Sequence, residues 1–389
     1  MGVAGAGGAG GAGGAGGAGG AGGAGGAGGA GGAGGTGGAG GAGGAGGAGG
    51  TLAHAGAPNT PLLSSALIIA NDGIIDPASK TARDFDHGPG GIDRMERVNP
   101  HYLRILLVEH LKAGLAVDGK PGHCAVTLAG TEIFRINRPK KGANPSVYCD
   151  KSGRQLDLVL AAADLRSDRL PEIILQQTDL LSFLGSTVRL HDVSHGWTLE
   201  VLRSVQDVAT IVHSQVKHHL STPRPVDVFP EASPIIQTPQ HSSLPSGHSV
   251  EASAMAYVLS RLAGETDKTV LTMNNLVLRM AARIAINRHV AGVHFPFESM
   301  AGFLLGISIG RVCYKRLAGG ATPLSKYTIT TDGMGDVDFH LRAFTDVITT
   351  PPKEWLTASE IPNPAGQTDE LKHVYGLTGK EWAHRASTT

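Results

Sequence analysis

The sequence predicts a mainly α-helical protein, a helical bundle that follows a disordered arm rich in glycine and alanine. Two observations carry this prediction. Apolar residues recur at helical spacing in six segments, the pattern of helices that bury one face. The start of the chain repeats a Gly-Gly-Ala triplet and has no charged residue. We therefore expect an arm at 1–59, a helical domain at 60–345 and an irregular tail at 346–389.

The arm places glycine at two of every three positions and contains no proline up to residue 57. A collagen triple helix is therefore not expected, and the ordering entropy of such a chain is large with nothing to bury against it. We predict a flexible, disordered segment. Its first residues lack the Lys or Arg and the Leu-rich core of a secretory signal, so the sequence leaves the compartment open between the cytoplasm and export by another route.

The expected elements follow in chain order. Residues 83–100 are typical of a loop rich in Gly and Asp, and 124–136 of short strands around a turn. The six helical segments are 155–163, 171–185, 197–220, 247–264, 267–289 and 296–315. After about residue 318 the periodicity is weak, so we expect irregular structure with one short helix near 341–348.

Charge and hydropathy exclude two broad classes of partner. The chain has 33 basic and 33 acidic side chains, which argues against general nucleic-acid binding. The apolar run 300–310 stops at Arg311, short of the roughly 20 residues that span a bilayer. We expect no nucleic-acid partner and no membrane span, and a homo-oligomer is compatible with these observations.

The stretch LPSGHSVEA, residues 244–252, carries the first chemical signal. A loop runs into Ser246, Gly247 and His248, and the residues after them have the pattern of a helix. A helix start offers unpaired N–H groups and positive potential, and glycine lets an anion approach the backbone closely. A histidine on that turn would move a proton beside the anion. The alternative is an N-cap serine followed by an ordinary polar histidine.

Two further blocks strengthen the anion interpretation. Upstream, Lys217 is followed seven residues later by Arg224 and a proline, and downstream Arg288 precedes His294 and Glu298. Three cations, a helix start and two histidines together would neutralise and orient a tetrahedral trianion, because the planar forks of arginine match its oxygens.

These blocks resemble the superfamily that joins vanadium-dependent haloperoxidases to type 2 phosphatidic acid phosphatases and soluble bacterial acid phosphatases. The family pattern is Lys, six residues, Arg-Pro; then Pro-Ser-Gly-His; then Ser-Arg, five residues, His, three residues, Asp. Residues 217–298 match it with two departures. Asn287 replaces the usual Ser, and Glu298 replaces the Asp that is expected to hydrogen-bond His294.

The resemblance implies a role for each matched residue. The equatorial oxygens of the anion would be bound by Lys217, Arg224 and Arg288, with Ser246 and the Gly247 N–H beside them. His294 would be the axial group, either the ligand to vanadium or the phosphorus nucleophile that becomes phosphohistidine. His248 would face the opposite apex and transfer protons, and Glu298 would orient His294.

One residue favours a haloperoxidase over a phosphatase. His241 stands five residues before Ser246, where bromide-type vanadium enzymes carry a second active-site histidine. The resemblance thus implies vanadate as cofactor, with hydrogen peroxide and a halide, bromide rather than chloride, as substrates. The alternatives are a soluble acid phosphatase acting on phosphate esters and, in another class, a non-enzymatic interaction protein with a relic anion site. Alternatively, His241 is an ordinary loop histidine exposed to solvent.

Overall fold

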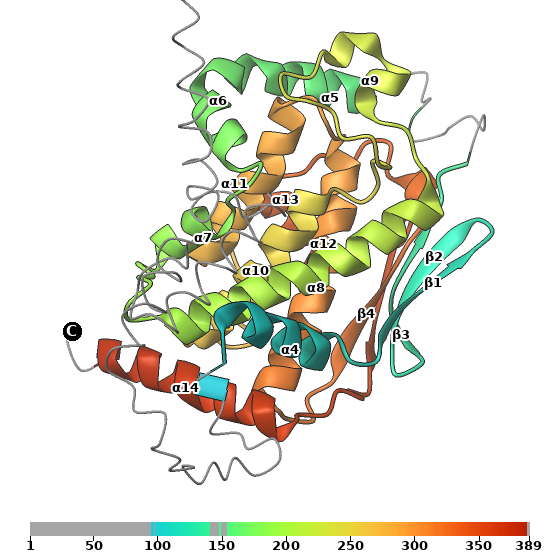
Figure 1. Ribbon diagram of the computed structural model, residues 1–389. Helices are drawn as coiled ribbons and strands as arrows, with labels where there is room; N and C mark the ends of the chain where they lie inside the picture. The colour runs from blue at the N-terminus through green and yellow to red at the C-terminus, as the bar shows by residue number, and fades with distance from the viewer. Residues whose placement is uncertain (1–94, 97, 141–147, 149–153, 387–389) are drawn as a thin grey trace, which may run out of the picture. The chain divides into compact units, whose positions relative to one another are not determined.

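The computed structural model in Figure 1 describes residues 95–96, 98–140, 148 and 154–386. The chain divides into two units, residues 1–101 and 102–389, and the elements below belong to the second, apart from the first two residues of one helix. The predicted arm at 1–59 and most of the predicted loop at 83–100 lie outside the described residues.

Four helices form the centre of the second unit. Helix α10 (Gly247–Leu262) packs against α8 (Gly196–Leu220), α11 (Leu276–Val290) and α12 (Pro296–Ala318) (Figure 1). Nearly every side chain of α12 is buried, including the apolar run at 300–310.

Glycines on α12 allow it to approach α10 closely. A Cβ added at Gly302 would lie 2.7 Å from the Ser246 carbonyl oxygen, and one at Gly310 would lie 2.8 Å from that of Ala254. At Gly306 a Cβ would clash with Ser253 and with the backbone of Val250. Because these glycines have no side chain, α12 can pack closely against α10. This close packing fixes the position of the α10 N-terminus.

Shorter helices surround this centre. They are α4 (Pro100–Lys112), α5 (Arg154–Ala162), α6 (Arg166–Leu175), α7 (Leu181–Thr187), α9 (Pro225–Val228), α13 (Leu341–Thr349) and α14 (Asp369–Ala386). Single 3-10 turns occur at η3 (Ala163–Leu165), η4 (Pro230–Ala232) and η5 (Thr331–Gly333). None of the helices within the described residues is both long enough and apolar enough to cross a membrane.

A five-stranded sheet accompanies the helices, so the helical bundle that the sequence predicts is only part of the structure. Its strands are β1 (Leu115–Lys120), β2 (His123–Leu128), β3 (Thr131–Asn137), β4 (Leu324–Ile329) and β5 (Leu356–Ile361), in that order across the sheet. β3 and β4 are parallel, and the other pairs are antiparallel. The strands expected around a turn at 124–136 are β2 and β3.

The expected helices differ from the observed ones in three places. The segment 171–185 is two helices, α6 and α7, and 267–289 becomes helical only at Leu276, where the side chain of Asn275 caps the first turn. The tail is not irregular, because β5 pairs with β4 and α14 packs against α8 and α12. On α14, Glu381 accepts hydrogen bonds from the Trp197 and Thr198 N–H groups at the start of α8.

Candidate active site

Ser246 and Gly247 lie at the buried N-terminus of α10, as the sequence predicts. The Ser246 N–H donates to the Glu298 carbonyl oxygen (3.1 Å), and the Ser249 hydroxyl donates to Ser246 Oγ (2.9 Å). Gly247 follows as the first helical residue. The N–H groups of a first helical turn have no partner inside the helix, so this end of α10 has donors to offer an anion.

Lys217 lies near the end of α8 with 2% of its surface exposed. Its Nζ donates to the carbonyl oxygens of Ser242 (3.0 Å) and Ser243 (2.7 Å), in the loop that leads to α10. Burial, and next the charge of Arg224, lower the pKa of Lys217 to about 7, against the opposing effect of Glu298. Neither of its two bonded partners carries a charge, so the ammonium group retains its capacity to neutralise an anion.

Arg224 precedes α9 and connects two loops. Its Nη1 donates to the Val293 carbonyl oxygen and to His294 Nε2, both at 3.0 Å. Its Nη2 donates to the His241 carbonyl oxygen (3.2 Å) and lies 3.1 Å from His241 Nδ1. His241 itself is exposed, so it stands at the outer side of this group.

His294 and Glu298 form a buried pair one helical turn apart. His294 Nδ1 lies 2.8 Å from Glu298 Oε2, which also accepts from the Ser243 hydroxyl (2.6 Å) and the Phe295 N–H (3.1 Å). Since an arginine only donates, the contact with Arg224 assigns the lone pair to His294 Nε2 and the proton to Nδ1. Burial, then Arg224, Lys217 and His248, hold the pKa of His294 well below its ordinary value. The ring is therefore a neutral imidazole with its lone pair on Nε2.

The carboxyl group of Glu298 is fully buried and has a fourth donor in the Tyr148 hydroxyl, 3.2 Å from Oε1. Burial raises its pKa to about 7, although the Ser243 hydrogen bond and Arg224 act in the opposite direction. The Glu at this position therefore makes the hydrogen bond to His294 for which an Asp was expected.

His248 points to the C-terminus of α6. Its Nε2 lies 2.9 Å from the Gln176 carbonyl oxygen, which can only accept, so the proton is on Nε2 and the lone pair on Nδ1. Burial, and next Arg288, lower the pKa of His248 to about 3. The ring is thus neutral and able to accept a proton at Nδ1.

Arg288 is a buried cation with weak partners. It is 1% exposed, and its Nη2 makes two long contacts of 3.4 Å, to the Ile173 carbonyl oxygen and to Gln176 Oε1. Its Nε has no hydrogen-bond partner among the described residues, and burial lowers its pKa to about 10. A buried guanidinium without a carboxylate beside it is suited to bind an anion.

Hydrogen bonds thus join the predicted residues into two groups. One contains Lys217, Arg224, His241, His294 and Glu298, and the other contains His248 and Arg288. The two groups are close enough for His248 to lower the pKa of His294. Their catalytic and binding roles stay predictions.

Sequence reasoning missed three residues that support these groups. Gln176 follows α6 and contacts both His248 and Arg288, while Ser243 and Tyr148 bond to Glu298. Ser243 lies in the loop just before the Pro-Ser-Gly-His motif, and this proximity could have identified it as a residue of the site. Gln176 is 72 and 112 residues from His248 and Arg288, and Tyr148 is 150 residues from Glu298, so no local pattern points to them.

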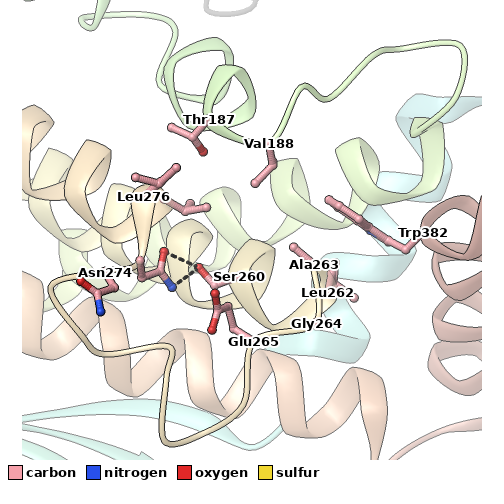
Figure 2. A pocket seen from close by; sticks show the side chains of 12 residues that line it. Thr187, Val188, Ser260, Leu262, Ala263, Gly264, Glu265, Asn274, Leu276 and Trp382 are labelled. Carbon is pink, nitrogen blue, oxygen red and sulfur yellow. Dashed lines mark hydrogen bonds between the residues drawn. The ribbon is translucent and has the colours of Figure 1, made fainter. Parts of the chain in front are cut away.

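A pocket of about 640 Å³ lies apart from these groups and contains none of the predicted site residues. Figure 2 shows its lining side chains, among them Thr187 at the end of α7, Leu276 at the start of α11 and Trp382 on α14. Ser260 and Asn275 hydrogen-bond to each other in its wall. No Lys or Arg lines this pocket, so it is not a candidate for the anion site.

Comparison with known families agrees with the geometry. Residues 204–319 match the model of the PAP2 superfamily. This segment is therefore similar to the PAP2 superfamily. It contains every residue predicted for the site, from Lys217 to Glu298. No curated protein matches the chain.

Proposed function

We propose that the protein is a vanadium-dependent haloperoxidase that oxidises a halide, bromide rather than chloride, with hydrogen peroxide. The observation that carries the proposal is the state of His294. Its Nε2 lone pair faces Arg224, its Nδ1 proton is held by Glu298, and Lys217 lies near it. A neutral imidazole with an oriented lone pair is what a metal ion requires of a histidine ligand.

The residues present fit vanadate. The anion cradle, which we define as Lys217, Arg224, Arg288, Ser246 and Gly247, is buried, and Arg288 Nε has no hydrogen-bond partner within the described part of the chain. Vanadate would be held by Lys217, Arg224, Arg288, Ser246 and the Gly247 N–H, with His294 as its protein ligand. When bound, it would supply a Lewis-acidic centre that activates peroxide toward a halide.

Arg224 has a double task in this scheme. In the structure it donates to His294 Nε2, so any atom that bonds to Nε2 takes the place of that hydrogen bond. The released Nη1 then has a donor to offer an oxygen of the anion. Arg224 thus keeps the lone pair oriented before the anion arrives and contributes to its binding afterwards.

His248 is the proposed acid–base residue. Because Nε2 is committed to the Gln176 carbonyl oxygen, Nδ1 is the atom that takes a proton from hydrogen peroxide and returns it to the departing water. Its low pKa keeps the ring neutral over the physiological pH range, so that Nδ1 has a lone pair to accept a hydrogen bond from peroxide.

His241 supports the preference for bromide within this proposal. The ring bonds to Arg224 and lies in the wall of two pockets, of about 440 and 260 Å³, which also reach Arg224 and Lys217. A halide or an organic substrate that enters from these pockets would pass His241 before it meets the cations.

A phosphatase is the second candidate, favoured by the match to the PAP2 superfamily. The same His294 Nε2 would attack phosphorus to form phosphohistidine, and a protonated His248 would give a proton to the leaving alcohol. The low pKa of His248 in the free protein is unfavourable for that second role, because a neutral ring has only its Nε2 proton to give.

A paired assay on one preparation tests the choice. We expect bromide-dependent oxidation by hydrogen peroxide that requires added orthovanadate, together with weak or no hydrolysis of a phosphate monoester in its absence. A His294→Ala preparation is the control for adventitious vanadate chemistry. Ester hydrolysis with a trappable phosphohistidine, and no vanadate-dependent oxidation, would replace the haloperoxidase proposal with the phosphatase.

A further inference from the structure

Two buried donor atoms near the start of α10 lack an acceptor, and the scheme above uses only one of them. Gln176, just after α6, is 0% exposed, and its Nε2 has no hydrogen-bond partner among the described residues. Arg288 Nε is in the same situation. Buried polar atoms in proteins are usually bonded, because a buried donor left unpaired is costly. Two such donors on neighbouring side chains therefore point to a shared acceptor.

The two side chains are in contact. Arg288 Nη2 lies 3.4 Å from Gln176 Oε1, and the Gln176 carbonyl oxygen accepts from His248 Nε2 at 2.9 Å. Oε1 and Nε2 of an amide are attached to the same carbon, so the unpaired Gln176 Nε2 lies next to the contact with Arg288. Gln176 thus joins the cation of this group to its histidine.

The orientation of the Gln176 amide decides whether its unpaired atom is a donor. Exchange of the amide oxygen and nitrogen would place an acceptor there instead. Arg288 can only donate, so the amide atom that faces it is the oxygen. Asn287 supports the same assignment, since its Nδ2 donates to Gln176 Oε1 at 3.0 Å. The atom left unpaired is therefore the NH₂ nitrogen.

The amide of Asn287 is itself held in one orientation. Its Oδ1 accepts from Arg169 Nη1 (3.0 Å), and its Nδ2 also donates to Glu172 Oε2 (3.1 Å). Arg283 binds both oxygens of the Glu172 carboxylate. An arginine cannot accept and a carboxylate cannot donate, so a reversed Asn287 amide would lose both contacts. The asparagine that departs from the family pattern thus supplies the donor that orients Gln176.

We propose that Gln176 is a further anion-binding residue, whose Nε2 donates to an oxygen of the bound oxyanion beside Arg288. This inference rests on the proposed anion site and adds one donor to the anion cradle. A ligand oxygen shared by Gln176 Nε2 and Arg288 Nε would give both buried donors an acceptor. The neutral amide suits this place, because a carboxylate here would neutralise Arg288 and repel the anion.

The test is the response of the Gln176 amide to inorganic phosphate in the full chain. NMR of protein labelled at the glutamine side-chain nitrogen follows this group, and its signal is identified by its loss in Gln176→Met. We expect one proton of the signal to move downfield as phosphate saturates the site, because a hydrogen bond to a charged acceptor forms. The exposed neighbour Gln177 is the internal control, and its signal should not move.

The affinity for phosphate, measured by calorimetry, gives the size of the contribution. Gln176→Met keeps the length of the side chain and removes the amide, so we expect binding to weaken about tenfold to hundredfold, as for one hydrogen bond to a charged group. Gln177→Met is the matched control and should bind as the wild type does. If Gln176→Met does not fold, Gln176→Glu retains an acceptor for Asn287 and Arg288 and identifies the NMR signal, and the phosphate response of the wild type then decides.

Phosphate binding without movement of the Gln176 signal would overturn the inference, because water or protein would then satisfy Nε2. Equal phosphate affinity of Gln176→Met and the wild type would overturn it too. In both cases, loss of binding in Arg288→Ala would show that the anion site itself stands. Absence of phosphate binding by the wild type would overturn the anion site and this inference together.

Discussion

At the scale of single residues, the candidate site is a set of buried charges that are only partly compensated. Lys217 donates to carbonyl oxygens and Arg288 has long contacts and an unpartnered Nε, so neither cation is neutralised by a bonded carboxylate. Desolvation of such groups is costly unless a ligand supplies the missing charge. Lys217 and Arg288 therefore lower the stability of the free protein and favour the binding of an oxyanion.

The two groups with a pKa of about 7 predict the pH dependence of kcat/KM. Glu298 accepts the Nδ1 proton of His294 as a carboxylate, and this form is lost as the pH falls through about 7. Lys217 loses its charge as the pH rises through about 7. We expect a bell-shaped profile whose two limbs belong to the Lys217–Glu298 pair of the free enzyme. A flat profile between pH 5 and 9 would contradict this reading.

Substitution of Glu298 tests its hydrogen bonds. Glu298→Ala removes the acceptor from the Tyr148 and Ser243 hydroxyls, His294 Nδ1 and the Phe295 N–H. Each buried donor left unpaired costs about 1–3 kcal/mol, so we expect a large loss in urea denaturation and at least a tenfold loss of activity. Glu298→Asp should retain more of both. Equal activity of the three proteins would mean that Glu298 only favours the start of α12.

At the scale of elements, the site is assembled where α8, α10 and α12 meet. α8 provides Lys217, α10 provides the N–H groups, and α12 approaches closely because its glycines leave room for the α10 backbone. The loops before α10 and α12 then add Ser243 and His294. The positions of the functional groups thus depend on how closely two buried helices pack.

Gly302 is the glycine on which the site depends most directly. In Gly302→Ala the new methyl would lie 2.7 Å from the Ser246 carbonyl oxygen, so the start of α10 must move. We expect about 1–3 kcal/mol of destabilisation, as for other overpacked cores, and weaker binding of phosphate. Gly376→Ala on α14, where a Cβ meets nothing within 4 Å, is the control and should raise stability slightly. Equal stability of the two variants in thermal unfolding would count against the packing account.

At the scale of the whole molecule, the segment 204–319 that matches the PAP2 superfamily is preceded and followed in the sequence by other elements of the fold. Strand β3 precedes the segment and β4 follows it, and the two pair in parallel. Helix α14 caps the start of α8 through Glu381. Elements outside the family segment therefore help to hold its helices.

The glycine- and alanine-rich arm gives a further prediction at this scale. Deletion of residues 2–55 should leave the fold and the activity intact, because an uncharged Gly/Ala chain contributes no apolar core. Circular dichroism, thermal unfolding and the oxidation assay on the shortened chain measure this. Loss of the cooperative unfolding transition would contradict the assignment of 1–59 as a disordered arm.

The sequence predicted those parts of the structure that depend on local pattern. The long helices follow from apolar spacing, and the His294–Glu298 contact follows from a separation of four residues at a helix start. The pairing of β4 with β3 joins residues almost 200 positions apart, and α14 was missed because it has few apolar residues on a mainly polar surface. Gln176 and Tyr148 become neighbours of the site only through packing, which no local pattern reports.

The most direct test of the account is vanadate retention by two histidine variants in equilibrium dialysis. If His294 supplies the bond that anchors the ion and His248 transfers protons, His294→Ala should lose bound orthovanadate. His248→Ala should keep most of it while turnover falls about 10²–10⁴-fold, the usual contribution of an acid–base group. Retention by His294→Ala together with loss by His248→Ala would reverse the assignment of the two histidines and contradict the site proposed here.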